Sequence, residues 1–265
     1  MSQLDKRTIE DFGDQWQRYQ GMDGFFGSVE LLKDMIEPLI KIGEIKDKVV
    51  LEIGSGNGRI AKMLLGAGAK KVIAIEPSDS YSVLMNNLSE NKNRIEAFNV
   101  RGEDIPEVKA DIIISIGVLH HIKNPNPVVQ RAFEILRKNG KFLFWVYGKE
   151  GNEKYLLFLN NIRKITRKLP DFILVGISHI LTFFTYPYIL LCKIFNLPLK
   201  GFMLNVMSKL NWSWKAFNIF DQLNPSYAKY YSKNEAIELM RSAGFKNIKI
   251  HHRHGYSWTV LGEKL

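Results

Sequence analysis

The stretch from Val49 to Pro77 constrains the fold of this chain more than any other. It begins with a short apolar run at 49–53, of the length and β-branched content typical of a buried parallel strand. Three alternate glycines follow, then apolar residues at helical spacing, and then a second apolar run at 72–75 that ends on Glu76. Strand, glycine turn, helix, strand and acid together predict half of a nucleotide-binding βαβ unit.

Each part of this unit has a physical role. Gly54, Gly56 and Gly58 let the chain turn sharply and let a ligand approach the backbone without meeting a Cβ. The helix that follows presents unpaired N–H groups and the positive end of its dipole. Glu76 comes 22 residues after Gly54, so it lies beside the turn and can accept hydrogen bonds from both hydroxyls of a ribose. We therefore expect an adenosine-type ligand.

The glycine spacing separates two kinds of cofactor. A dinucleotide fingerprint needs glycine at position 59, where Arg59 stands, and the pattern reads E-x-G-x-G-x-G from Glu52 to Gly58. In this pattern the chain resembles the class I S-adenosylmethionine-dependent methyltransferases. The resemblance implies S-adenosylmethionine as cofactor, S-adenosylhomocysteine as product and no metal, with Glu52 and the turn on the methionine portion and Glu76 on the ribose. An NAD-dependent oxidoreductase and a non-catalytic scaffold at a membrane surface are the alternatives.

The rest of the chain extends this fold. We predict an α/β Rossmann-like three-layer sandwich, with a mostly parallel sheet closed by an antiparallel C-terminal strand and a helical insertion after the fifth strand. The capping box that begins at Ser232 predicts a helix to Ala243. The remaining predicted elements are strands at 95–100, 111–116, 141–147, 245–252 and 256–262, a helix at 79–90 with Ser78 or Asp79 as N-cap, and a helix at 128–136 that Asn139-Gly140 ends.

Four segments follow from this division. They are an N-terminal helical flap at 1–46, a cofactor-binding Rossmann-like core at 47–148, a helical apolar insertion or cap at 149–230, and the C-terminal helix and closing strands at 231–265. Residues 29–45 read as a helix interrupted near Pro38. An aromatic-rich stretch precedes them, and the family resemblance makes Trp16 and Tyr19 the contacts of a flap over the cofactor. A helix simply packed on the domain is the alternative.

The insertion holds 21 residues without a charge, Phe172 to Cys192, which is long and apolar enough for a transmembrane candidate. A single crossing would leave the strands beyond residue 230 on the wrong side of the membrane. Two interpretations remain, a buried helical cap over the active site and a monotopic segment in one bilayer face. Either predicts a lipophilic acceptor.

The loop after strand 111–116 carries the catalytic candidates, because ligands bind at the carboxyl ends of parallel strands. His121 is the candidate general base for a hydroxyl acceptor, since its ordinary pKa is about 6.5. The alternative is that both adjacent histidines fix the loop. The stretch 119–125 resembles small-molecule methyltransferases, and the [DNS]-P-P-[YF] motif of amino-directed DNA methyltransferases is absent. The substrate candidates are His120, Tyr147 and Tyr227, and the further cofactor candidates are Ser55, Pro77, Glu103, Asp104, Ile116 and Gly117.

Composition bounds the partners. The net charge of +10, from 37 basic and 27 acidic residues, suits an anionic membrane surface or nucleic acid. The single Cys192 and the polar N-terminus fit a cytoplasmic protein, peripheral on the inner face of a membrane in one interpretation. Our expectation is a small-molecule acceptor, lipophilic or lipid-linked, with an anionic membrane surface as a second candidate partner and no nucleic acid. His251, His252 and His254 read as a solvated hairpin turn, and we predict no metal site.

Overall fold

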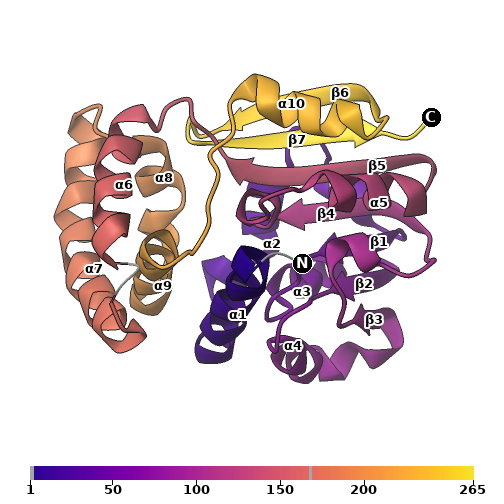
Figure 1. Cartoon of the computed structure of the whole chain (residues 1–265), viewed down its shortest axis with the longest axis horizontal. Helices are drawn as coiled ribbons and strands as arrows, with labels where there is room; N and C mark the ends of the chain where they lie inside the picture. Colours follow the sequence, from indigo (N-terminus) through magenta and orange to yellow (C-terminus); the bar gives the residue numbers. More distant parts are fainter. Residues whose placement is uncertain (1–2, 167–168) are drawn as a thin grey trace.

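A computed structural model describes residues 3–166 and 169–265 (Figure 1). Seven strands form one sheet in the order β3-β2-β1-β4-β5-β7-β6. The first five pair in parallel, β7 is antiparallel to β5, and β6 is antiparallel to β7. The predicted Rossmann-like fold is confirmed. The strands are β1 (Val49–Ile53), β2 (Lys71–Ile75), β3 (Ile95–Phe98), β4 (Ala110–Ile116), β5 (Leu136–Tyr147), β6 (Lys246–Arg253) and β7 (Ser257–Glu263).

Helices cover both faces of the sheet, because each face is apolar. One core packs between the sheet and the helices α2 (Val29–Ile36), α3 (Arg59–Gly66) and α4 (Tyr81–Asn87), and includes side chains of the insertion. The other core packs under α5 (Asn126–Ile135) and α10 (Lys233–Ser242). The central strands carry side chains to both cores, which explains their unbroken apolar runs.

The N-terminal segment begins with a helix, α1 (Gln3–Arg18), whose bounds were not predicted from the sequence. Of the aromatic-rich stretch, Phe12 and Trp16 lie in α1, and Tyr19, Phe25 and Phe26 follow it. The helix predicted from residue 29 ends at Ile36, two residues before Pro38, since the residue before a proline is disfavoured in the helical region. Short 3₁₀ turns complete the chain at Phe25–Gly27, Ile42–Ile45, Ser89–Arg94, Gly102–Asp104, Leu119–His121 and Met207–Lys209.

Two predicted boundaries are wrong. Helix α4 begins at Tyr81 and its N-cap is Ser80, so neither Ser78 nor Asp79 caps it. The Ser78 hydroxyl donates to the Glu76 carboxylate and accepts from the Ser80 N–H at 3.3 Å. Helix α5 ends at Ile135 and strand β5 begins at Leu136, so Asn139-Gly140 lies within the extended segment. A left-handed residue, Asn139, marks that point. The turn signal was therefore real, but it bends a strand instead of ending a helix.

The insertion forms a helical unit beside the sheet, on the left of Figure 1, with α7 outermost. It consists of α6 (Glu153–Thr166), α7 (Asp171–Ile194), α8 (Lys200–Asn205) and α9 (Trp212–Leu223). Its two ends meet in a short stem, where Lys149 N–H donates to the Tyr231 carbonyl and Tyr231 N–H donates to the Tyr147 carbonyl, both at 2.8 Å. The chain therefore leaves the sheet and returns to it at one place.

Candidate active site

A cavity of about 260 Å³ lies at the carboxyl ends of the central strands. The turn after β1, the acid after β2 and the loop after β4 line one part of it, and α1, β5 and the insertion helix α9 line the other. One cavity therefore joins the predicted cofactor turn to the insertion. Its lining includes ten of the predicted site residues: Trp16, Gly54, Gly56, Glu76, Pro77, Glu103, Ile116, Gly117, His121 and Tyr147.

The glycine turn is built as its sequence requires. Gly54, Gly56 and Gly58 all have positive φ angles, of 78°, 53° and 88°. Side chains are disfavoured there, and a Cβ on Gly56 would lie 2.6 Å from the indole nitrogen of Trp16. Helix α1 therefore packs directly on the turn, so the flap and the cofactor turn form one surface.

Glu76 is a buried acid with three hydrogen bonds. Its Oε2 accepts from Gly56 N–H at 2.7 Å, and its Oε1 accepts from the backbone N–H and the hydroxyl of Ser78, at 2.9 and 2.6 Å. The side chain is 6% exposed and lines the cavity. It fixes the turn and still presents a carboxylate to a ligand.

Glu52 lies behind the turn and does not line the cavity. Burial raises the pKa of its carboxyl to about 8, against the Ser55 hydroxyl and the Arg59 guanidinium, which lower it. Burial also lowers the pKa of Arg59 to about 10, and the Arg59 guanidinium stacks 4.0 Å from the centre of the Phe26 ring. Within the described part of the chain, no group hydrogen-bonds Glu52 Oε2 or Arg59 Nε. An acceptor, Glu52 Oε2, and a donor, Arg59 Nε, are thus without a hydrogen-bond partner beside the turn in the described part of the chain.

The two adjacent histidines have different surroundings. The Nδ1 of His121 lies 2.8 Å from the Tyr227 carbonyl, and its ring lines the cavity. His120 is fully buried 4.0 Å from the Tyr147 ring, and neither of its nitrogens has a partner among the described residues. Burial lowers the pKa of both rings, that of His120 well below its ordinary value. Only His121 is placed to meet an acceptor.

A carboxylate from the insertion, Asp221 of α9, enters the cavity beside β5. The Tyr147 hydroxyl donates to it at 3.1 Å, and the Gln15 amide of α1 donates to it at 2.9 Å. The Gln222 amide donates to the Tyr147 hydroxyl at 2.7 Å. Burial, followed by the charge of Asp221, raises the pKa of Tyr147 well above its ordinary value. The N-terminal helix α1, the sheet and the insertion thus share one polar cluster at a cavity whose lining is mostly apolar.

Seven predicted residues lie outside the cavity lining. Tyr19 packs on Phe217 with the ring centres 5.0 Å apart, and Tyr227 contributes only the carbonyl that holds His121. The others are Glu52, Ser55, Gly58, Asp104 and His120. Glu103 does line the cavity, but its carboxylate pairs with Arg101. A cofactor contact at Glu103 therefore has to share this carboxylate with Arg101.

Several lining residues were missed by the sequence reasoning. Phe217, Asn218 and Asp221 come from the insertion, and Arg253 and Tyr256 come from the β6–β7 hairpin. Helical periodicity could have placed Phe217 and Asp221 on one face of α9, because they are four residues apart. Nothing in the local pattern could show that this face would meet the glycine turn.

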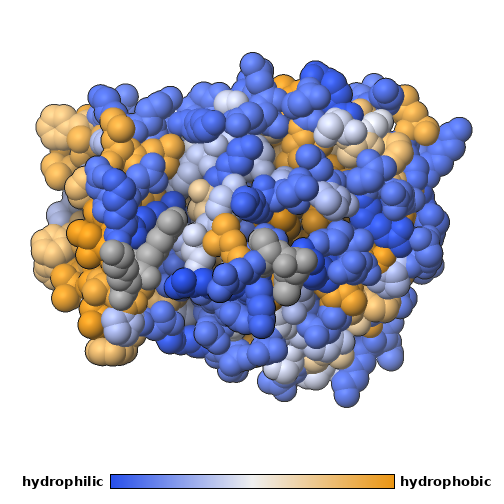
Figure 2. All heavy atoms as spheres, viewed as in Figure 1, coloured by the Kyte–Doolittle hydropathy of each residue, from blue (hydrophilic) through white to orange (hydrophobic). Residues whose placement is uncertain are grey.

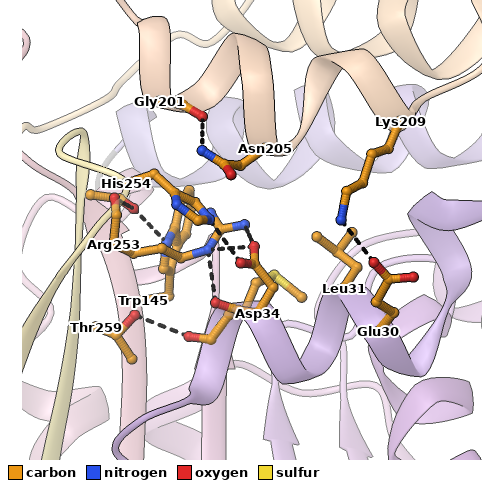
Figure 3. A network of polar contacts seen from close by, with 12 residues as sticks. Glu30, Leu31, Asp34, Trp145, Gly201, Asn205, Lys209, Arg253, His254 and Thr259 are labelled. Atoms are coloured by element: carbon orange, nitrogen blue, oxygen red, sulfur yellow. Dashed lines mark hydrogen bonds and ion pairs between the residues drawn. The ribbon is translucent and has the colours of Figure 1, made fainter.

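A buried ion pair ties the N-terminal helices to the C-terminal hairpin (Figure 3). Arg253 is 3% exposed and donates from Nε to the Asp34 carboxylate and carbonyl, both at 3.0 Å. His254 lies 2.7 Å from the other carboxylate oxygen of Asp34. The histidine-rich turn is thus anchored by a distant acid that the sequence did not indicate. The described residues contain no group of three or more His, Cys, Asp or Glu side chains that could hold a metal ion.

Comparisons with known proteins bear on the fold and on the family of this chain. A family model described as "Methyltransferase domain" matches residues 29–250. Magnesium protoporphyrin IX methyltransferase of Synechocystis PCC 6803 has a similar structure, with a TM-score of 0.57 and 14% identity over 98% of this chain and 100% of that one. Human N-acetylserotonin methyltransferase gives a TM-score of 0.55 and 13% identity over 96% and 56%. At these identities the structural likeness shows the fold.

A curated relative overturns one expectation. The tRNA U34 carboxymethyltransferase of Cellvibrio japonicus is 31% identical over 133 residues, which are 46% of this chain and 41% of that protein. The chain thus spans about two fifths of the relative's length. Because the relative is named for a tRNA substrate, our expectation of a small-molecule acceptor with no nucleic acid partner is contradicted. The sequence basis for it, a missing DNA-methyltransferase motif, said nothing about RNA.

Proposed function

Because the chain belongs to the methyltransferase domain family, we propose that it transfers a methyl group from S-adenosylmethionine to a lipophilic or lipid-linked acceptor. One observation carries the proposal: a single cavity joins the glycine turn and Glu76 to a chamber lined by Phe12, Trp145 and Phe217. The cofactor's sulfonium activates its methyl carbon, so transfer is an in-line displacement. The protein aligns the acceptor and excludes water. Neither an oxidoreductase nor a non-catalytic scaffold is favoured.

The residues at the turn fit this cofactor. Glu76 keeps a carboxylate in the cavity for a ribose, and the positive-φ glycines bring the backbone close to a ligand. Glu52 Oε2, buried behind the turn and without a hydrogen-bond partner among the described residues, suits the amino group of the methionine portion through a bridging water, because Glu52 itself does not line the cavity. We extend the proposal to the other candidate contacts, Trp16 and Glu103, which line the same cavity.

His121 is the proposed general base for a hydroxyl acceptor. A carbonyl can only accept, so Nδ1 of His121 must donate to Tyr227, which leaves a lone pair on Nε2. Burial lowers the pKa of the ring, so the imidazole is neutral and ready to take a proton at pH 7. Tyr147 and Asp221 supply the polar contacts of the acceptor end.

We retain the four-segment division as part of the proposal, with 1–46 as flap, 47–148 and 231–265 as core, and 149–230 as the acceptor-binding insertion. A lipophilic acceptor also supports the expectation of a cytoplasmic protein that works at the inner face of a membrane. The contact between Trp16 and the glycine turn supports the flap, since a moving α1 would open the cavity.

A tRNA nucleoside is the second candidate acceptor. The curated relative's name and the net charge of +10 favour it. The aromatic chamber favours the lipophilic acceptor, although a nucleobase can also stack on aromatic rings. Only an experiment that offers both acceptors separates the two.

The test uses S-adenosylmethionine with a labelled methyl group. The purified protein is offered a membrane lipid extract in one reaction and total tRNA in another. Label in a lipid fraction, reduced at least about 100-fold in His121→Ala while S-adenosylhomocysteine affinity is unchanged, supports the proposal with His121 as base. Label in tRNA alone refutes the lipophilic acceptor. Cofactor binding without transfer to either acceptor favours the scaffold.

A further inference from the structure

Helix α7 exposes large apolar residues that a surface helix of a water-soluble protein would bury. Its buried side carries three hydroxyl residues, Ser178, Thr182 and Thr185, beside three apolar ones, Leu174, Ile189 and Cys192, and its exposed side carries large apolar residues. Phe172 and Ile194, near its two ends, are each 75% exposed, and Phe183 is 64% exposed. An ordinary surface helix turns its large apolar residues to the core. This helix is built for an apolar environment outside the molecule.

The buried hydroxyl groups of α7 are satisfied within the helix. The hydroxyls of Ser178, Thr182 and Thr185 each donate to a carbonyl of their own helix at 2.7 Å. These side chains are therefore satisfied without water, and they are small enough for α9 to pack closely against α7. Helix α7 thus packs on α9 through its buried side, and its large exposed apolar residues take no part in this contact.

The exposed apolar residues form a continuous outer face that includes α6. Figure 2 shows apolar spheres gathered at the edge of the molecule where α6 and α7 lie. Such patches on water-soluble proteins mark interaction sites. We call this surface the outer face, and its members are Leu157, Phe158, Ile165, Phe172, Ile180, Leu181, Phe183, Phe184, Tyr186, Leu190, Leu191, Ile194, Phe195 and Trp212.

The charges around the outer face are mainly positive. From Glu153 to Phe220 the sequence has nine basic residues and two acids, Glu153 and Asp171, of which Asp171 pairs with Arg18 of α1. Three of the basic residues are engaged elsewhere, since Arg163 and Lys215 are buried and Lys209 pairs with Glu30. Lys154, Lys164 and Lys193 are exposed, and no carboxylate of the described residues pairs with them. A second copy of the chain would bring the same positive charge to the same rim. An anionic layer is complementary to it.

Helix α7 is the one helix among the described residues that is long and apolar enough to cross a membrane, with 28% of its apolar window buried. Its packed side and the stem at Lys149 and Tyr231 keep it joined to the sheet, so it does not leave the domain. We propose that the outer face docks on an anionic phospholipid bilayer, with α7 lying in the plane of the interface. This inference goes beyond the proposed function and does not depend on which acceptor is methylated.

Co-sedimentation with vesicles tests the proposal on the full chain. The vesicles are an equal mixture of phosphatidylcholine and phosphatidylglycerol, and phosphatidylcholine alone. The variant Ile180→Gln/Phe183→Gln/Phe184→Gln removes apolar area from the outer face. The matched control, Met85→Gln/Leu265→Gln, changes exposed apolar residues elsewhere. Lys164→Glu/Lys193→Glu reverses two rim charges. Retained S-adenosylhomocysteine binding reports that each variant is folded, so a failed cofactor site is distinguishable from a failed docking face.

We expect the wild type and the control to sediment with the mixed vesicles, and more weakly with phosphatidylcholine. The triple variant binds at least about tenfold more weakly, because three apolar side chains no longer leave water when the face docks. The charge variant loses the preference for anionic lipid. Wild type that stays in the supernatant overturns the proposal, as does an unaffected triple variant. A wild-type dimer that the triple variant abolishes, without vesicle binding, assigns the face to a second copy.

Discussion

Replacing Glu76 by alanine tests the cofactor site at one carboxylate. Its two oxygens already accept three hydrogen bonds within the chain, from Gly56 and Ser78. Because a carboxylate has about four acceptor positions, about one remains for a ribose hydroxyl. A hydrogen bond to a charged group contributes about 1.5–3 kcal/mol. The expected loss of affinity for S-adenosylhomocysteine is therefore about 10- to 100-fold.

The same substitution acts on the turn. Without the carboxylate, the Gly56 N–H loses its partner, so the free energy of unfolding falls by about 1–3 kcal/mol. Isothermal titration of S-adenosylhomocysteine measures the first effect and urea unfolding the second. Glu96→Ala is the matched control, since Glu96 is a strand acid paired with Lys71 at the surface. A folded Glu76→Ala protein with unchanged affinity would refute the placement of the ribose.

Two further predictions concern stability. Glu52 has a folded pKa of about 8, above its ordinary 4.5, so its contribution is fully present below pH 4.5 and is lost as the pH rises to about 8. Between pH 5 and 8, the free energy of unfolding measured in urea should fall by on the order of 3–5 kcal/mol more in the wild type than in Glu52→Gln. An equal fall in both proteins contradicts the raised pKa of Glu52. Asp34→Ala leaves the buried Arg253 guanidinium without its counter-charge and should cost about 3–5 kcal/mol. Glu238→Ala, which breaks an exposed pair with Arg241, should cost less than about 1 kcal/mol, and a similar cost for both argues against a structural ion pair at Asp34.

The part of the fold that could be read from the sequence is the part with local causes. The run 49–53, the glycine turn and Glu76 each act through neighbours in the chain or through the next parallel strand, so spacing alone places them. The five later strands and the capping box at Ser232 could likewise be predicted from local sequence pattern. The predicted N-caps Ser78 and Asp79 are wrong because the helix begins later, at Tyr81, and the Ser78 hydroxyl is hydrogen-bonded within the loop to Glu76 and Ser80.

The acceptor end could not be read in this way. The Gln15 amide meets Asp221 across 206 residues of sequence, and Arg253 meets Asp34 across 219. Polar residues of these types are ordinary surface residues by pattern, and only the folded insertion brings them into contact. The charge-free run at 172–192 gave the right helix but left its environment open. One side of this helix packs against the rest of the insertion and the other is exposed, which local sequence pattern alone does not show.

The stem at the root of the insertion has a consequence for how such chains diversify. Because Tyr147, Lys149 and Tyr231 already hold the two ends together, residues 149–230 leave the domain after β5 and rejoin it before α10 at one place. A change of loop length within these residues adds little closure entropy and leaves the register of β5 and β7 untouched. The α9 side of the cavity can therefore change while the glycine turn and Glu76 stay in place.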